Sequence, residues 1–172
     1  MMRISVPDGG MSFFDHQPEL FGLFNQYYGT LWSEGVLDQA TKEVGRLRNA
    51  RVTGCNICKN LRFAGARDDG LTEDLVTGIA DGYETGDLPE RFKLVIRYAD
   101  VLITDPKGVS DDLRAALLAE FTPEQIVELT ATITAAMGFS KAAVAFGPPP
   151  DMPVLVVPTP TPDGSVSDPL PS

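Results

Sequence analysis

Residues 43–62 read EVGRLRNARVTGCNICKNLR, and the rest of the chain is organised around this stretch. It contains the only two cysteines of the sequence, Cys55 and Cys58, in a Cys-x-x-Cys arrangement. It also contains a single carboxylate, Glu43, among several arginines and lysines. Thr53-Gly54 is a helix-breaking pair directly before the first cysteine. We therefore predict a helix that ends at this pair and a second helix that begins near Cys55.

Helical patterns extend on both sides of this stretch. Apolar residues recur at spacings of three and four, and prolines or capping residues precede several of the runs. No stretch alternates between apolar and polar residues over a length that would form a sheet. The sequence therefore predicts an all-α fold, a helical bundle of about seven helices. The expected helices cover residues 18–34, 38–52, 55–64, 72–79 and 89–104, the stretch after Ser110, and residues 122–146.

Length and composition indicate one soluble, globular domain. At 172 residues the chain is long enough for a hydrophobic core, and 43% of its residues are apolar. The net charge of −10 argues against nucleic acid as a partner, because phosphate binding needs a basic surface. No apolar run approaches the roughly 18 residues of a membrane span, and residues 1–16 contain no apolar signal-peptide segment. We therefore expect a cytoplasmic protein with no membrane or nucleic-acid partner.

Composition changes near Gly147. Nine of the fourteen prolines lie in residues 148–172, and this density favours extended polyproline geometry over a packed core. We therefore divide the chain into a helical domain, residues 1–147, and a Pro-rich extended or disordered tail, residues 148–172. The apolar run 154–157 has two interpretations. It is either a chance patch in a disordered segment or part of an arm that lies on a neighbouring subunit.

The chemistry of the cysteines depends on ionisation, because a thiol attacks as its thiolate and a free cysteine has a pKa of about 8.5. Cys55 is expected at the start of a helix, where backbone N–H groups favour an anion. Half of the fourteen basic residues fall between residues 42 and 67, where Glu43 is the only acid. The spacing of the two cysteines also lets one sulfur close a disulfide with the other. Together these features predict a redox-active pair.

Other interpretations of this stretch remain open. A Cys-x-x-Cys can be half of a zinc site, but His16 is the only histidine, so subunits would have to share the metal. The two cysteines can also be buried and structural, and the basic cluster can be an ordinary solvated helix face. Glu43 is either a structural residue of its helix or, if the chain doubles back after Gly54, a base for a thiol.

These residues resemble the alkylhydroperoxidase D-like branch of the carboxymuconolactone decarboxylase superfamily. The resemblance covers roughly residues 13–147. It implies an all-α fold and a homo-oligomer, often a trimer or hexamer. The matching positions are Lys42-Glu43, Cys55, Cys58, Gly70-Leu71-Thr72 with Asp74, and the segments 92–102 and 121–126.

The resemblance also implies a chemistry. Redox members of the family reduce peroxides or pass electrons through the cysteine pair. They need no bound cofactor, and their electrons come from an external thiol donor, in some cases a lipoyl protein or another dithiol. Carried onto this chain, Cys55 and Cys58 are the redox couple and Glu43 is the proton acceptor of the relay.

Two positions depart from the family pattern. The family has a histidine four residues after the second cysteine, where this chain has Arg62. Some members have another histidine directly before that cysteine, where this chain has Ile57. Arg62 cannot shuttle protons near neutral pH, but Arg62 and Arg51 can stabilise a thiolate or bind an anionic substrate.

The predicted function is that of an antioxidant enzyme: a thiol-dependent alkyl hydroperoxidase or disulfide oxidoreductase with peroxiredoxin activity. Its substrate would be a peroxide or a disulfide, and a thiol-donor protein would be a partner. One alternative is a carboxymuconolactone decarboxylase-like enzyme, whose chemistry does not call for the cysteine pair. Another is a non-catalytic helical oligomer that responds to redox state. We expect a local role for His16, and a core, subunit-interface or apolar substrate-pocket position for the aromatic residues 21–32.

Overall fold

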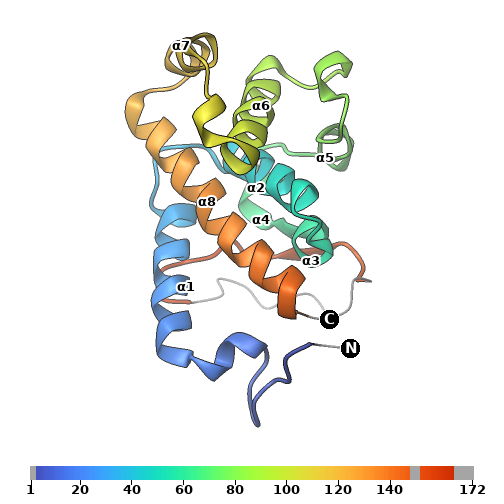
Figure 1. Ribbon diagram of the computed structural model, residues 1–172, viewed down its shortest axis with the longest axis vertical. Helices are drawn as coiled ribbons and strands as arrows, with labels where there is room; N and C mark the ends of the chain where they lie inside the picture. The colour runs from blue at the N-terminus through green and yellow to red at the C-terminus, as the bar shows by residue number, and fades with distance from the viewer. Residues whose placement is uncertain (1–2, 148–151, 165–172) are drawn as a thin grey trace.

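The computed structural model describes residues 3–147 and 152–164, and it confirms the all-α fold (Figure 1). These residues contain eight α-helices, three short 3-10 helices and one two-stranded sheet. The α-helices are α1 (Pro18–Ser33), α2 (Gln39–Val52), α3 (Asn56–Asn60), α4 (Ala64–Asp68), α5 (Glu73–Gly78), α6 (Glu90–Thr104), α7 (Asp111–Glu120) and α8 (Pro123–Phe146). The 3-10 helices are η1 (Phe13–His16), η2 (Tyr83–Thr85) and η3 (Pro106–Gly108), and the strands are β1 (Leu61–Phe63) and β2 (Leu155–Val157).

Local capping signals place most helix ends close to where the sequence predicts them. Asp38 caps α2 by accepting a hydrogen bond from the backbone N–H of Thr41, at 2.7 Å. Thr122 forms a reciprocal capping box with Gln125 at the start of α8. Gly54, at φ +71°, takes the left-handed conformation that follows the end of α2. The chain therefore turns directly before the cysteine pair, as predicted.

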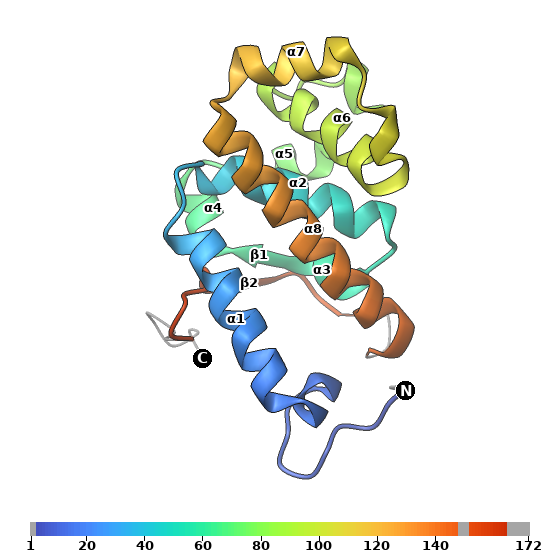
Figure 2. The ribbon, with the colours of Figure 1, turned by 60° about the vertical axis from the view of Figure 1, so that its left-hand side comes forward.

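The prediction of one helix over residues 55–64 is wrong. Helix α3 ends at Asn60, and the chain then extends as β1 before α4 begins. Strand β1 pairs in parallel with β2, a contact that also corrects the expectation of no sheet (Figure 2). The register pairs Leu61 with Leu155, Arg62 with Val156, and Phe63 with Val157. Distant residues supply this partner, so local periodicity could not reveal it.

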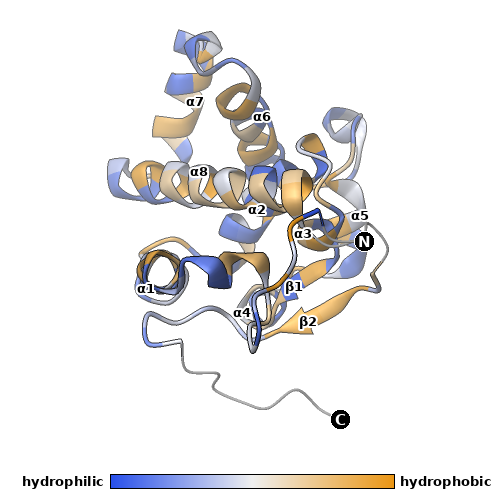
Figure 3. Ribbon diagram, turned by 60° about the horizontal axis from the view of Figure 1, so that its bottom comes forward, coloured by the Kyte–Doolittle hydropathy of each residue, from blue (hydrophilic) through white to orange (hydrophobic). Residues whose placement is uncertain are grey.

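Part of the predicted tail lies along the chain's own helical domain. The side-chain amide of Asn60 donates to the carbonyl of Met152 at 2.6 Å. The backbone N–H of Gly65 donates to the hydroxyl of Thr159 at 2.8 Å. Figure 3 shows β2 as an apolar strand beside β1. Three of the four residues of the apolar run 154–157 therefore form an ordered strand on this chain, which corrects the interpretation of a disordered patch.

Helix α1 leaves room for the tail at Gly29. A Cβ atom at this position would lie 2.1 Å from the carbonyl carbon of Thr161, so only glycine permits the observed approach. The remaining residues of the predicted tail, 148–151 and 165–172, lie outside the described part of the chain. The division into a helical domain and a tail at Gly147 remains a prediction.

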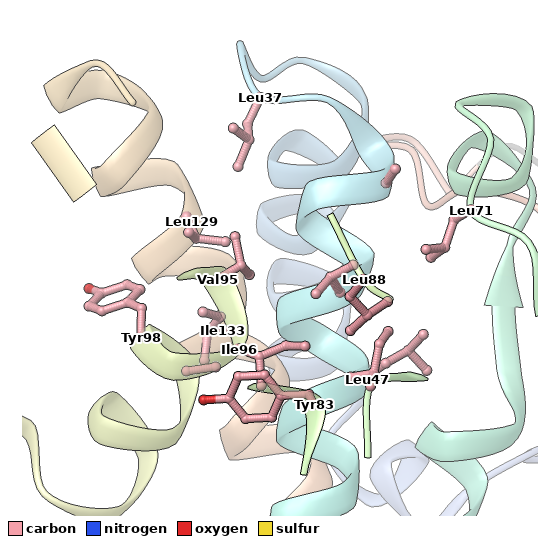
Figure 4. Close-up of a cluster of buried hydrophobic side chains, with 14 of the residues drawn as sticks. Leu37, Leu47, Leu71, Tyr83, Leu88, Val95, Ile96, Tyr98, Leu129 and Ile133 are labelled. Carbon is pink, nitrogen blue, oxygen red and sulfur yellow. The ribbon is translucent and has the colours of Figure 1, made fainter. Parts of the chain in front are cut away.

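The hydrophobic core forms where α2, α6 and α8 meet (Figure 4). Leu47 of α2, Ile96 of α6, and Leu129 and Ile133 of α8 are each at most 1% exposed. Gly45 lets α2 and α8 approach closely, because a Cβ atom there would lie 2.9 Å from the side chain of Ile133. This core fixes α2 in the middle of the domain, and α2 in turn positions the segment that carries the cysteines.

Helix α8 requires one further correction to the sequence analysis. It is long and apolar enough to cross a membrane by length and composition, with a mean hydropathy of 1.3 over its most apolar window. In the structure one side of α8 packs along α2, and Leu129 and Ile133 belong to the core described above. The core helix of a soluble protein has the same length and composition, so this helix is weak evidence for a membrane span.

Candidate active site

Cys55 and Cys58 form a disulfide at the turn between α2 and α3, with Cα atoms 5.3 Å apart. Cys55 occupies the N-cap position of α3, and its sulfur accepts the backbone N–H of Cys58 at 3.3 Å. The predicted pairing and the predicted position at a helix start are both observed. Gly54 makes this geometry possible, since its left-handed conformation reverses the chain between the two helices.

Both cysteines are buried, at 2% exposure for Cys55 and 5% for Cys58. They form a small cluster with Ala50 of α2 and Ala143 of α8, and Phe139 packs against its edge. Their surroundings are therefore mainly hydrocarbon. Chemistry at either sulfur needs local opening of this cluster, or a substrate that reaches it through an apolar route.

Glu43 does not contact a sulfur atom in any described hydrogen bond. Its carboxylate is fully buried and binds the guanidinium of Arg46 through two contacts of 2.6 Å. It also accepts the backbone N–H of Phe63 at 3.4 Å. Burial alone would lower the pKa of Arg46, but the charge and hydrogen bonds of Glu43, together with a smaller effect of Tyr28, outweigh burial and raise it. The predicted approach of Glu43 to the thiols is replaced by this ion pair.

The Glu43–Arg46 pair nevertheless supports the cysteine segment through the backbone. Arg46 donates to the carbonyls of Cys58 and Leu61, both at 2.8 Å. Its guanidinium also lies over the ring of Phe63, 4.8 Å from the ring centroid. The chain does double back after Gly54, so that α2 lies beside the end of α3 and the start of β1. Glu43 thus supports the segment that carries the cysteines by holding Arg46 in place.

Most of the basic cluster is paired inside the protein and is not a solvated face. Lys42 is fully buried and binds Glu128 of α8 at 2.9 Å. Arg48 donates to Asp100 of α6 at 2.9 Å. Helix α2 therefore buries several of its charged residues against carboxylates that lie far away in the sequence.

Arg51 and Arg62, predicted to act on a thiolate or a substrate, contact other groups, and none of their described contacts is with either sulfur. Arg62 pairs with Glu73 at 3.0 Å, and Arg51 donates to the carbonyl of Val76 at 2.7 Å. Burial lowers the pKa of Arg51, and the charges of Arg48 and Arg62 lower it further. A role of either arginine in stabilising a thiolate finds no support in the described contacts.

Both arginines line a polar cavity of about 680 Å³ on the outer side of α3. A role in binding an anionic substrate remains a prediction, and this cavity is where it would apply. The other lining residues are Asn56, Lys59, Asn60, Met152 and Pro153.

Two functional candidates escaped the sequence analysis. The side-chain amide of Asn49 on α2 donates to the hydroxyl of Ser140 on α8, at 3.0 Å. That hydroxyl in turn donates to the sulfur of Cys58, at 3.3 Å. Ser140 is separated from Asn49 by 91 positions and from Cys58 by 82, so no local spacing rule links them. The sequence offers only a weak indication of this contact, which is the position of Ser140 within a largely apolar part of α8.

An apolar pocket of about 530 Å³ lies between α1 and α8. Phe139 belongs both to this pocket and to the residues packed against the cysteine cluster. Its ring stacks on Phe14 with centroids 4.9 Å apart. The aromatic residues of α1 therefore divide between two roles, since Trp32 is fully buried whereas Phe21 and Phe24 line the pocket.

The histidine and metal interpretations can also be compared with the structure. His16 lies in η1, and its Nε2 is 2.9 Å from the carbonyl oxygen of Ser5. The described residues contain no group of three or more His, Cys, Asp or Glu that could hold a metal ion. The zinc interpretation therefore has no ligand set within residues 3–147 and 152–164.

Residues 18–82, which include the cysteine pair and Glu43, match the family model described as "Carboxymuconolactone decarboxylase family". This match supports the resemblance to the carboxymuconolactone decarboxylase superfamily that the sequence predicts. The segment matched by the family model contains α1 to α5 and therefore the whole turn that carries Cys55 and Cys58.

Two curated relatives of the chain come from Mycobacterium tuberculosis: the uncharacterized proteins MT2376 (strain CDC 1551 / Oshkosh) and Rv2313c (strain H37Rv). Each is 34% identical over 135 residues, which cover 77% of this chain and 47% of the relative. The chain thus spans about half the length of these two relatives. Both relatives are uncharacterized, so their similarity to this chain assigns no activity to it.

A solved structure has the same fold. ATU0492 of Agrobacterium tumefaciens, a protein of unknown function and a candidate AhpD antioxidant defence protein, superposes with a TM-score of 0.70. The superposition covers 88% of this chain and 99% of ATU0492 at 23% sequence identity. At this identity the similarity shows that the chain has the all-α, AhpD-like fold, and it assigns no activity.

Proposed function

We propose that this protein is a thiol-dependent hydroperoxidase that uses Cys55 and Cys58 as its redox couple. The observation that carries the proposal is the disulfide itself, which closes at a helix start with a hydrogen-bond donor on each sulfur. Such donors favour a thiolate after reduction, and a thiolate is the form that attacks peroxides. An antioxidant role also agrees with the fold shared with ATU0492.

The reaction would proceed in three balanced steps. The thiolate of one cysteine attacks an oxygen of the hydroperoxide, the O–O bond breaks, and the alkoxide leaves and is protonated to the alcohol. The attacking cysteine is now a sulfenic acid, and the thiol of the second cysteine attacks its sulfur, releases water and closes the disulfide. Two external thiol groups then return two electrons by thiol–disulfide exchange and become a disulfide themselves. A dithiol such as a lipoyl group is the proposed donor.

The apolar pocket favours an organic hydroperoxide over hydrogen peroxide. Phe139 lies between this pocket and the cysteine cluster, so an alkyl group held there would bring its peroxide toward the sulfurs. Burial of an alkyl chain against aromatic rings contributes binding through the hydrophobic effect. This arrangement would explain why the cysteines are buried. A substrate that displaces Phe139 on entering the pocket would at the same time expose a sulfur.

The protein is also proposed to act as a cytoplasmic homo-oligomer, a trimer or hexamer. Large apolar side chains are exposed on helices α1 and α8: Leu20 is 65% exposed, Leu23 66% and Val127 69%. Residues of this kind favour a further contact when they cluster on one surface. Sedimentation analysis would test the assembly directly.

The experiment that tests the proposed reaction compares the wild type with Cys55→Ser and Cys58→Ser variants. Consumption of cumene hydroperoxide is measured with dihydrolipoamide as the electron donor. We expect both variants to fall to the rate of the uncatalysed mixture, because each lacks one sulfur of the couple. Unchanged rates in both variants would rule the mechanism out. Turnover of a carboxylated lactone by the double variant would favour the decarboxylase-type reaction instead.

A further inference from the structure

The hydroxyl of Ser140 behaves differently from the threonine hydroxyls of α8. Thr130, Thr132 and Thr134 each donate to a carbonyl of their own helix one turn earlier, at 2.6 to 2.9 Å. This back-bonding is the usual arrangement for a hydroxyl inside a helix. Ser140 instead donates across the helix interface to the sulfur of Cys58, at 3.3 Å. Some other group must therefore hold it in this orientation.

Asn49 is that group. Its Nδ2 donates to the Ser140 oxygen at 3.0 Å, and an amide nitrogen can only donate. The serine oxygen therefore acts as an acceptor toward Asn49, which leaves its hydrogen for the sulfur. Asn49 is fully buried and Ser140 is 1% exposed, so water does not compete for these contacts. Consecutive hydrogen bonds in such a setting polarise one another and strengthen the last donor.

The orientation of Asn49 leaves one of its own atoms unsatisfied. Its Oδ1 is buried and has no hydrogen-bond partner within the described residues. Buried polar atoms without a partner are uncommon because they lose hydration without compensation. If the amide were turned over, Oδ1 would accept the Ser140 hydroxyl, but Cys58 would then lose its donor. The observed arrangement thus satisfies the sulfur at the expense of the amide oxygen.

We propose that Ser140 stabilises the thiolate of Cys58 after the disulfide is reduced, with Asn49 as the residue that positions it. This inference rests on the proposed redox function and assigns two residues to it. A hydroxyl bonds more strongly to a thiolate than to a neutral thiol, so the contact favours ionisation. The pair supplies a side-chain donor at a position where Arg62 is turned toward Glu73 and Glu43 toward Arg46.

The test measures ionisation of Cys58 in the full chain carrying Cys55→Ser, so that a single thiol is present. Ultraviolet absorbance of the thiolate is followed against pH, because this signal does not require the sulfur to be accessible. We expect Ser140→Ala to raise the midpoint by about one pH unit, a tenfold loss of thiolate below the midpoint. Asn49→Ala should shift it in the same direction by less, and Ser140→Thr should restore it.

Thr132→Val provides the matched control. It removes another buried α8 hydroxyl, but one that binds only its own helix, so the midpoint should not move. Circular dichroism verifies folding of each variant, and Asn49→Ala repeats the test from α2 if an α8 variant does not fold. Folded Ser140→Ala and Asn49→Ala variants with an unshifted midpoint would overturn the inference.

The readout also separates this inference from the proposed function. A shifted midpoint in a protein that consumes no hydroperoxide would reject the peroxidase activity and leave the role of Ser140 intact. An unshifted midpoint in an active peroxidase would reject the role of Ser140 alone.

Discussion

The two sides of α2 are both buried, but by different means. On the side that faces the core, Val44 and Leu47 pack against hydrocarbon side chains of α6 and α8 (Figure 4). On the adjoining side, Glu43 and Arg46 are buried as an ion pair that holds the backbone of the segment that carries the cysteines. The apolar side holds α2 in the core through hydrophobic packing. The polar side positions the backbone of Cys58 and Leu61 through hydrogen bonds from Arg46. The two sides should therefore respond differently to mutation.

Removal of one charge on the polar side should have the largest effect. Glu43→Ala leaves Arg46 buried without a counter-charge, which typically destabilises a protein by about 3–5 kcal/mol. The double variant Glu43→Leu/Arg46→Leu should lose less, because no charge remains buried. Urea unfolding at neutral pH measures both. If the double variant were no more stable than Glu43→Ala, the unpaired charge of Arg46 would not be the cause of the loss of stability.

On the apolar side, removal of volume should cost stability alone. Leu129 is fully buried, so Leu129→Ala should lower the free energy of unfolding by about 3 kcal/mol through lost burial and a cavity. Since no charge is involved, the loss should be the same at low and high salt. Urea unfolding at two ionic strengths checks this. A loss of stability that depends on salt would contradict the view that this side is stabilised by hydrophobic packing alone.

Alkaline pH should weaken the polar side through Tyr28. Burial raises the pKa of Tyr28 to about 12, from an ordinary value near 10. The unfolded chain therefore loses this proton first, and stability should fall between pH 10 and 12, by up to about 2 kcal/mol from this residue. Tyr28→Phe should reduce that fall, whereas Tyr27→Phe, at an exposed position of α1, should not. Thermal unfolding across this pH range provides the measurement.

The smallest loss of stability is expected at the N-terminus of α2, where Asp38 caps the helix. Burial would raise the pKa of Asp38, but hydrogen bonds from Thr41 and the charge of Arg91 hold it below the usual range. Asp38→Ala should cost about 1 kcal/mol at neutral pH. The difference from wild type should shrink as acid protonates Asp38. Asp38→Asn, which keeps a cap, should cost less at neutral pH, and equal losses in the two variants would argue against capping.

The sequence predicts those parts of the fold that depend on neighbouring residues. The caps at Asp38 and Thr122 and the turn at Gly54 each involve only a few consecutive positions, and all three are observed. The pairing of Cys55 with Cys58 is local in the same sense. Each of these features is decided by short-range sterics or hydrogen bonds, so one sequence is sufficient to find it.

Features that depend on distant partners were missed or misread. The charges of α2 suggested a solvated face, yet Lys42 meets Glu128, a residue 86 positions away. Glu43 was expected at a thiol, but Arg46 on the same helix is a closer and stronger partner. The hydroxyl of Ser140 was missed because only the packing of α8 on α2 brings it to Cys58. For Lys42 and Ser140, tertiary packing supplies a partner that sequence spacing does not show, whereas Arg46 lies only three positions after Glu43 on the same helix.

The pairing of β1 with β2 has a consequence for the order of folding. The contact between Gly65 and Thr159 closes a loop across 94 positions, and contacts of such long range form late and slowly. A ribosome-bound chain that has reached only α8 can already pack its helices, but it still lacks the strand that lies against the residues after Cys58. Until β2 pairs with β1, the site around the thiols would be incomplete, and the thiols would be more accessible to oxidants and chaperones than in the folded protein.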